Sequence, residues 1–258
     1  MSPKTEVSRD AIERVGTLRI AASPETVMAG AAERIAQLLD EAVAARGVAT
    51  MALAGGSTPR QVYRLLSAEP HNRGIPWDRV RLFLGDERCV PADHPDSNQR
   101  MVHESLLARL PHPPAFHPMA CSGHDREEAA ARYRDCLARE VPEHASGIPR
   151  FDLILLGMGD DAHTASLFPG TPILDETRPV APVFVPEKNA WRMSLTLPVL
   201  NAARHVLFLV TGANKAQALA AVFSGHPDRD RPASLVRPGS GALEWHVDAA
   251  AAVRVPRQ

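Results

Sequence analysis

Short apolar runs alternate with longer segments whose apolar positions recur at helical spacing. The runs that predict strands are residues 17–22, 48–54, 79–85, 151–157 and 206–212. Helices are predicted between or after them, over residues 23–47, 58–69, 97–110 and 213–225. Continuous apolar strands separated by amphipathic helices are typical of a parallel sheet covered on both faces. We therefore expect an α/β fold with a mostly parallel central sheet.

The segment 23–47 carries the clearest helix signals. Ser23 is placed to cap it, Pro24 occupies the first helical position, and Gly47 stands where the helix should end. Its apolar face is predicted from six residues at helical spacing: Val27, Ala31, Ile35, Leu38, Leu39 and Ala42.

No internal repeat and no low-complexity segment divides the chain of 258 residues. The densest proline cluster, residues 111–118, is too short for a flexible tether and is expected to link a helix to an edge strand. One α/β domain over residues 1–258 is therefore predicted.

The composition favours a globular protein of the cytoplasm. Lys and Arg number 29 against 30 Asp and Glu, a balance that points to neither nucleic acid nor an anionic membrane. No apolar run approaches the roughly 20 residues of a membrane helix, and the first 16 residues lack the apolar core of a signal peptide. Cys89, Cys121 and Cys136 are odd in number and lack metal-ligand spacing, so we expect reduced thiols.

The stretch "LAGGSTP" interrupts the chain between a predicted strand and a predicted helix. Gly55 and Gly56 would let the backbone approach a ligand, and Ser57 or Thr58 could cap the helix, with Pro59 at its first position. Free N–H groups at a helix start suit a phosphate. An ordinary tight turn is the alternative. The stretch lacks the glycine-lysine pair of a nucleotide P-loop, and G-x-S-x-G occurs nowhere in the chain.

A second group of polar residues follows the strand 79–85, in a segment that we expect to be a polar loop over residues 86–96. Asp86, Glu87 and Arg88 stand at its carboxyl end, where side chains of a parallel sheet point into the ligand crevice. A solvated loop with a local ion pair is the alternative.

The stretch "LLGMGDDAHTASLFPG" follows the strand 151–157. Residues 157–162 fit the dinucleotide fingerprint G-x-G-x-x-A, but Asp160 and Asp161 would lie where a pyrophosphate should sit, so we reject that interpretation. A carboxylate and an imidazole remain, Asp161 and His163. This pair is a plausible general base, although a lone histidine is usually structural.

Two cations late in the chain could complete an anion pocket. Lys215 follows the strand 206–212, and Arg192 lies in "WRMSLTLPVL". Either could instead be ordinary surface. We predict no catalytic metal, because five further histidines show no ligand pairing on a shared face: His94, His103, His112, His117 and His124.

With these motifs, the sequence resembles the 6-phosphogluconolactonase family, part of a larger group that includes glucosamine-6-phosphate deaminases. The matching stretches are "LAGGSTP", "LGDERCVP" through "DSN", "LGMGDDAHTASLFPG", "WRMSLTLPVL" and "TGANKA", within roughly residues 20 to 251. The resemblance implies a Rossmann-like three-layer domain that hydrolyses 6-phospho-D-glucono-1,5-lactone. This is the second step of the oxidative pentose phosphate pathway, and it needs no metal or organic cofactor. The partner is then a small phosphosugar lactone, and the chain is expected to be a monomer or weak homo-oligomer.

The resemblance also implies roles for single residues. The corner formed by Gly55, Gly56, Ser57 and Thr58 would hold the phosphate, together with Arg192 and Lys215. The implied catalytic residues are His163, Asp161, Arg88 and Asp86. His163 would activate water, and Asp161 would position the imidazole or a sugar hydroxyl. Arg88 would face the lactone oxygens or the phosphate.

The chain departs from the family's usual D-G-H at one residue, because Ala162 stands in place of the glycine. If the backbone there has positive φ, alanine costs on the order of 1 kcal/mol. If φ is negative, the methyl group only narrows the floor of the pocket.

Two other functions are weighed. A deaminase on the same scaffold would place a glutamate five residues after the histidine and read D-E-Y, whereas this chain has Phe168 and Asp86-Glu87-Arg88. A non-catalytic sugar-phosphate sensor would keep the phosphate pocket and lose the acid–base pair, but Asp161 and His163 are both present.

Overall fold

The computed structural model describes residues 15–121, 123, 125–142, 147–224 and 226–256. His124 and most of the N-terminal stretch tested for a signal peptide lie outside these residues. Among the helices of the described part, none has both the length and the apolar character needed to cross a membrane.

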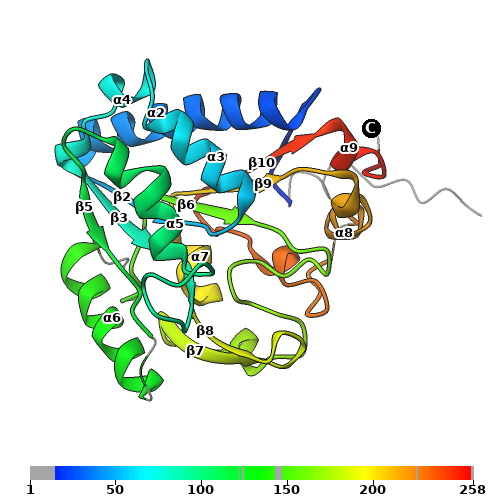
Figure 1. Cartoon of the computed structure of the whole chain (residues 1–258). Helices are drawn as coiled ribbons and strands as arrows, with labels where there is room; N and C mark the ends of the chain where they lie inside the picture. The colour runs from blue at the N-terminus through cyan, green and yellow to red at the C-terminus, as the bar shows by residue number, and fades with distance from the viewer. Residues whose placement is uncertain (1–14, 122, 124, 143–146, 225, 257–258) are drawn as a thin grey trace, which may run out of the picture.

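The described residues form a sheet of seven parallel strands (Figure 1). Its strands, in spatial order, are β1 (Thr17–Ala21), β10 (Ala242–Asp248), β9 (His205–Val210), β6 (Leu153–Gly157), β2 (Ala49–Leu53), β3 (Val80–Leu84) and β5 (Ala115–His117). The predicted parallel α/β fold is confirmed. The proline cluster does hold the edge strand β5, whereas β10 was not predicted as a strand.

Helices cover both faces of this sheet (Figure 1). α2, α3 and α5 pack side by side over one face. The helices described are α2 (Pro24–Arg46), α3 (Ser57–Leu66), α4 (His71–Gly74), α5 (Asn98–Ser105), α6 (Arg126–Glu140), α7 (Leu197–Ala202), α8 (Ala216–Val222) and α9 (Ala249–Ala252).

Helix α2 forms as its sequence predicts. The Ser23 hydroxyl accepts the N–H of Thr26 at 3.4 Å, and Pro24 begins the helix. Gly47 ends it with φ 76°, a left-handed conformation that glycine adopts without a Cβ clash. All six residues of the predicted apolar face are buried.

Three further strands form a small antiparallel sheet beside the large one. They are β4 (Asp86–Arg88), β8 (Ala190–Leu195) and β7 (Val180–Val185). The expectation of a polar loop after β3 is wrong for residues 86–88. These residues form a strand because β8, about 100 residues later in the chain, supplies the backbone partners.

The prediction of three reduced thiols is also wrong. Cys89 and Cys121 form a disulfide with their Cα atoms 4.7 Å apart, and Cys136 is free. Their separation of 32 residues conceals the pairing in the sequence. The fold creates it, because Cys89 follows β4 and Cys121 follows the edge strand β5.

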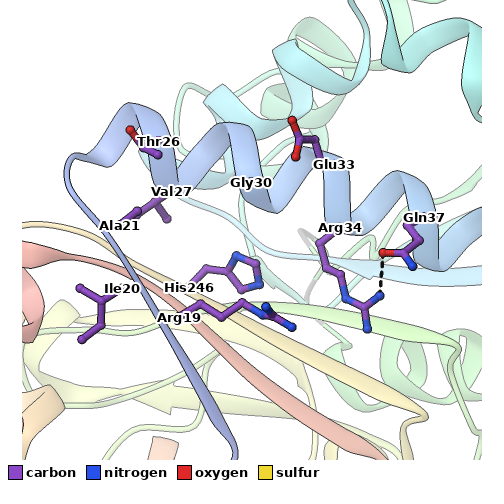
Figure 2. A pocket seen from close by; sticks show the side chains of 10 residues that line it. All are labelled: Arg19, Ile20, Ala21, Thr26, Val27, Gly30, Glu33, Arg34, Gln37 and His246. Atoms are coloured by element: carbon purple, nitrogen blue, oxygen red, sulfur yellow. Dashed lines mark hydrogen bonds between the residues drawn. The ribbon is translucent and has the colours of Figure 1, made fainter.

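A polar cluster lies at the opposite edge of the sheet, between β1 and α2. The buried Glu244 accepts hydrogen bonds from the Nε atoms of Arg19 and Arg34, both at 2.9 Å. A cavity of about 660 Å³ opens beside this cluster, and Figure 2 shows both arginines with His246 on its wall. Burial acts to raise the pKa of Glu244, but the bonds from Arg34 and Arg19 outweigh it and hold this pKa at about 2.

We predict that Glu244→Gln lowers the free energy of unfolding by about 2 kcal/mol at pH 7, because two guanidinium groups lose their carboxylate. The folded-state pKa lies below its usual value of 4.5. The stabilisation is therefore complete above about pH 5 and is lost as the pH falls towards 2. Urea denaturation at pH 7 and pH 3 measures both effects. The exposed Glu187→Gln is the control, and a difference between Glu244→Gln and wild type that did not shrink in acid would contradict the assignment.

Candidate active site

A cavity of about 260 Å³ lies beyond the carboxyl ends of β2, β6 and β9. Predicted site residues from five separate segments line it: Gly55, Gly56, Ser57, Thr58, Asp86, Arg88, His163, Arg192 and Lys215. Asp161 contacts His163 at its border. In open α/β sheets, ligands bind beyond the carboxyl ends of the strands. The fold therefore brings the predicted residues together.

The glycine corner after β2 requires both of its glycines. Gly56 has φ 109°, which side-chain-bearing residues rarely adopt. A Cβ on Gly55 would lie 2.2 Å from the side-chain oxygen of Asn98, so the backbone can pass Asn98 only without a side chain. Gly56 is also the N-cap of α3, which begins at Ser57 without a side-chain cap. The predicted capping by Ser57 or Thr58 is therefore wrong.

The three charged residues after β3 do not share one direction. Asp86 and Arg88 line the cavity, whereas Glu87 is directed towards the start of α5. The expectation that all three face the crevice is wrong, because successive side chains of a strand point to opposite faces.

Glu87 ties β4 to α5. Its carboxylate accepts the backbone N–H groups of Asn98 and Gln99, each at 2.8 Å, and the Ser97 hydroxyl at 3.1 Å. Burial raises the pKa of Glu87, and these N–H donors oppose that effect. A carboxylate at a helix start also satisfies N–H groups that have no partner within the helix.

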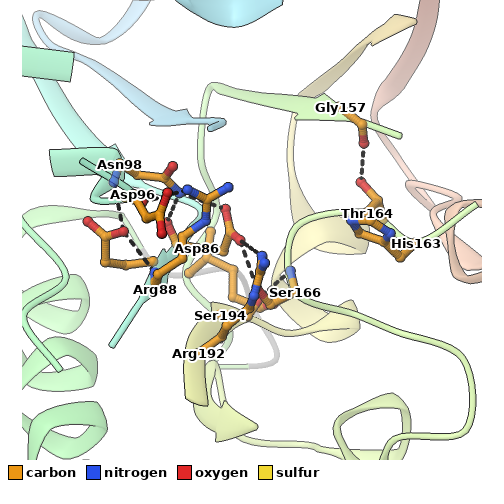
Figure 3. Close-up of polar contacts among 12 residues, drawn as sticks. Asp86, Arg88, Asp96, Asn98, Gly157, His163, Thr164, Ser166, Arg192 and Ser194 are labelled. Carbon is orange, nitrogen blue, oxygen red and sulfur yellow. Dashed lines mark hydrogen bonds and ion pairs between the residues drawn. The ribbon is translucent and has the colours of Figure 1, made fainter. Parts of the chain in front are cut away.

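Asp86 is the centre of a buried polar network that sequence reasoning missed in part (Figure 3). It accepts the Ser166 hydroxyl at 2.7 Å and the Asn98 side-chain N–H at 3.3 Å. Arg192 Nη1 lies 3.8 Å from the same carboxylate, and the Ser166 N–H donates to Ser194 Oγ at 3.1 Å. Ser166, Ser194 and Asn98 are small polar residues in the recognised stretches, and only their burial distinguishes them.

His163 and Asp161 are in contact, so of the two partners expected for Asp161, the imidazole or a sugar hydroxyl, the structure shows the imidazole. His163 Nδ1 lies 2.5 Å from Asp161 Oδ1, which also accepts the His163 backbone N–H at 3.1 Å. Burial acts to raise the pKa of Asp161, but the bonds from His163 prevail and hold this pKa at about 2. Asp161 is therefore a carboxylate at neutral pH, so Nδ1 is the donor. Nε2 remains to exchange a proton.

The turn that presents His163 depends on Gly159. A Cβ there would lie 2.1 Å from His163 Nδ1 and 2.4 Å from Asp161 Oδ1. This glycine of the apparent dinucleotide fingerprint therefore makes room for the imidazole. Ala162 has φ 60°, which resolves the question raised by the sequence: the backbone is left-handed, and alanine is strained there.

Lys215 also lines the cavity. Its Nζ forms an ion pair with Asp160 Oδ1, which also accepts the Asn214 side-chain N–H at 2.9 Å. The hydrogen bond from Lys215 lowers the pKa of Asp160. The Thr58 and Thr211 hydroxyls lie 3.0 Å apart beside it, and Thr211 is a lining residue that sequence reasoning missed.

Histidine, cysteine and carboxylate side chains within the described ranges form no group of three or more that could hold a metal ion. The absence of a catalytic metal stays a prediction.

We predict that Ala162→Gly raises the free energy of unfolding by about 1 kcal/mol, because glycine relieves the left-handed strain. Ala130→Gly in α6 is the matched control, since it also deletes a buried methyl group. That variant should lose about 1 kcal/mol. Chemical denaturation measures both, and equal losses in the two variants would show that φ at residue 162 carries no cost.

Comparisons with known proteins identify relatives of this chain. The family model described as "Glucosamine-6-phosphate isomerases/6-phosphogluconolactonase" matches residues 22–245. The chain is 43% identical to a 6-phosphogluconolactonase of Synechocystis sp. over 213 residues, which cover 81% of this chain and 86% of that protein. It is 38% identical to the 6-phosphogluconolactonase of Homo sapiens, over 92% of this chain and 93% of that protein.

Solved structures agree. The 6-phosphogluconolactonase of Trypanosoma brucei superposes with a TM-score of 0.84 at 30% identity, covering 93% of this chain and 99% of that one. A monomeric glucosamine-6-phosphate deaminase, at 20% identity and a TM-score of 0.77, shares the fold. The chain therefore belongs to the glucosamine-6-phosphate isomerase/6-phosphogluconolactonase family.

Proposed function

We propose that the chain hydrolyses 6-phospho-D-glucono-1,5-lactone to 6-phosphogluconate in the oxidative pentose phosphate pathway, with His163 as the general base. One observation carries the proposal: a single cavity is lined by the imidazole held by Asp161 and by the glycine corner with Lys215. A site that hydrolyses a phosphorylated lactone needs one group that binds the phosphate and another that activates water.

The anion-binding end is built from backbone and cations. The N–H groups at the start of α3 follow the glycine corner, and a helix start favours negative charge. Lys215 adds a positive charge to the lining of the cavity. A substrate phosphate would compete with Asp160 for this ammonium group. Arg192 completes the predicted phosphate set.

The proposed hydrolysis uses the imidazole nitrogen that Asp161 leaves free. His163 Nε2 removes a proton from a water molecule while the water oxygen forms a bond to the lactone carbonyl carbon. The carbonyl π electrons move to oxygen, and a cation such as Arg88 stabilises this oxyanion. The oxyanion then re-forms the carbonyl as the bond between that carbon and the ring oxygen breaks. The bonding pair leaves with the ring oxygen, and protonated His163 gives it a proton, so the products are a carboxylic acid and a hydroxyl group. Asp161 keeps its charge throughout and holds the ring.

Asp86 supports the cationic side of the site. It lies between Ser166 and Arg192, and it is itself buried. In the antiparallel register Arg88 pairs with Arg192, and the Arg192 guanidinium lies 3.8 Å from the Asp86 carboxylate. The proposed reaction uses no metal or organic cofactor. A cytoplasmic location, one domain and a monomer or weak homo-oligomer remain predictions.

The deaminase alternative is not supported by the residue at position 168. Phe168 is buried with its ring against His163, at the position where the resemblance would place a glutamate in a deaminase. The phenyl group of Phe168 cannot accept or donate the proton that a deaminase transfers when it opens the sugar ring.

We predict that His163→Ala lowers kcat for the phosphorylated lactone at least 100-fold, because it removes the group that accepts the proton from water. Binding of 6-phosphogluconate, measured by calorimetry, should stay within about threefold. The rate assay subtracts spontaneous lactone opening. His103→Ala, on the exposed face of α5, is the control. Near-normal turnover by His163→Ala would remove His163 from the proposed role.

We predict that Lys215→Met raises KM for the phosphorylated lactone about tenfold or more and changes kcat little. The lost charge contacts the non-reacting end of the substrate. Turnover of unphosphorylated glucono-1,5-lactone should not change, because it has no phosphate to lose. Lys188→Met is the control, an exposed lysine after β7. Equal losses with both lactones would contradict a phosphate contact for Lys215.

A further inference from the structure

We propose that Phe168 is a positioning residue that fixes the plane of the His163 imidazole; this inference rests on the proposed function of His163. The two rings are stacked, with centroids 4.0 Å apart and an angle of 19° between their planes. Phe168 is 2% exposed, so its ring lies in the core and presents one face to the site. Both residues belong to the segment between β6 and β7.

The hydrogen bond to Asp161 leaves the imidazole one freedom that matters for catalysis. A bond from Nδ1 to one carboxylate oxygen restrains the ring at that nitrogen alone. Small changes of the side-chain torsions χ1 and χ2 can turn the ring and still keep Nδ1 within hydrogen-bonding reach of Asp161. Such a turn sweeps Nε2 across the cavity. A flat ring stacked at van der Waals distance opposes it, because tilting the imidazole drives one of its edges into the phenyl carbons.

Phe168 can serve as a fixed platform because its own backbone is held. Its carbonyl accepts the Thr171 hydroxyl at 2.7 Å and the Thr171 backbone N–H at 3.3 Å. Upstream, the Leu167 N–H donates to the Thr164 carbonyl at 2.9 Å, and the Thr164 hydroxyl donates to the Gly157 carbonyl at 2.8 Å. The loop is thus tied to the end of β6 and to itself on both sides of the ring.

The same phenyl ring also contacts a cation of the site. The guanidinium carbon of Arg192 lies 5.3 Å from its centroid, within the range of a cation–π interaction. Arg192 reaches the ring from β8, whereas His163 reaches it from the loop after β6. One side chain therefore sets the relative placement of the proposed base and of a cation beside Asp86. This placement matters because the reacting groups must be closely aligned before the reaction can occur.

The competing interpretation is that Phe168 only fills the core. Both interpretations predict lost stability on truncation, so stability cannot separate them. They differ in kcat and in the magnetic environment of the imidazole. A platform for His163 must place its ring protons over an aromatic face, where the ring current shifts their resonances upfield. A residue that only fills the core could be replaced by another apolar side chain without a fall in kcat.

The test compares Phe168→Leu and Phe168→Met with Phe151→Leu. Phe151 is also a fully buried phenylalanine, at the amino end of β6 and away from the cavity. We expect both substitutions at 168 to lower kcat about tenfold with KM for the phosphorylated lactone within twofold, and the control to keep kcat within twofold. Near-ultraviolet circular dichroism establishes that each variant is folded.

If wild type hydrolyses the lactone and folded Phe168→Leu does so equally fast, the inference fails. If wild type itself has no activity, the proposed function fails instead.

A second measurement needs no activity and no substitution at residue 168. Proton NMR of the wild type, with the His163 resonances assigned through His163→Asn, should show its ring protons upfield of those of an exposed histidine. In Phe168→Leu they should return downfield. Wild-type His163 resonances at ordinary positions would overturn the stacking, as would a fall in kcat without any movement of these resonances.

Discussion

The parallel pairing of β2, β6 and β9 with their neighbours is the constraint on which the site depends. Because these strands run in the same direction, their carboxyl ends meet at one edge of the sheet. Each strand is followed there by a turn that carries polar residues, and the turns come from widely separated parts of the chain. Had one of these strands been antiparallel, its turn would lie at the opposite edge, and the anion-binding corner would be separated from the imidazole.

Glycines shape this edge of the sheet as much as the charged residues do. Gly55 lets the backbone pass Asn98, and Gly159 leaves room for the pair of His163 and Asp161. Ala162 lies at a position that would also favour glycine, because its backbone is left-handed. A strained residue beside a proposed catalytic group persists only when its surroundings hold it in place.

The charges of the cavity are arranged in partnered sets before any substrate is present. Lys215 pairs with Asp160, Arg192 lies beside Asp86, and His163 is held by Asp161. Such pairing keeps cations oriented towards the cavity at low energetic cost, and a substrate anion can exchange with a carboxylate partner. Burial strengthens the contact between Arg192 and Asp86 relative to that of a surface ion pair.

The sequence by itself determined the parallel α/β architecture, the boundaries of α2 and the contact between Asp161 and His163, because each depends on periodicity or on residues close together in the chain. Only the tertiary structure decided that Asp86–Arg88 is a strand that directs Glu87 away from the cavity, that Cys89 meets Cys121, and that Phe168 stacks on His163. The first two depend on partners distant in the chain. The third depends on how a loop folds back over itself, and neither kind of contact leaves a periodic trace in the order of residues.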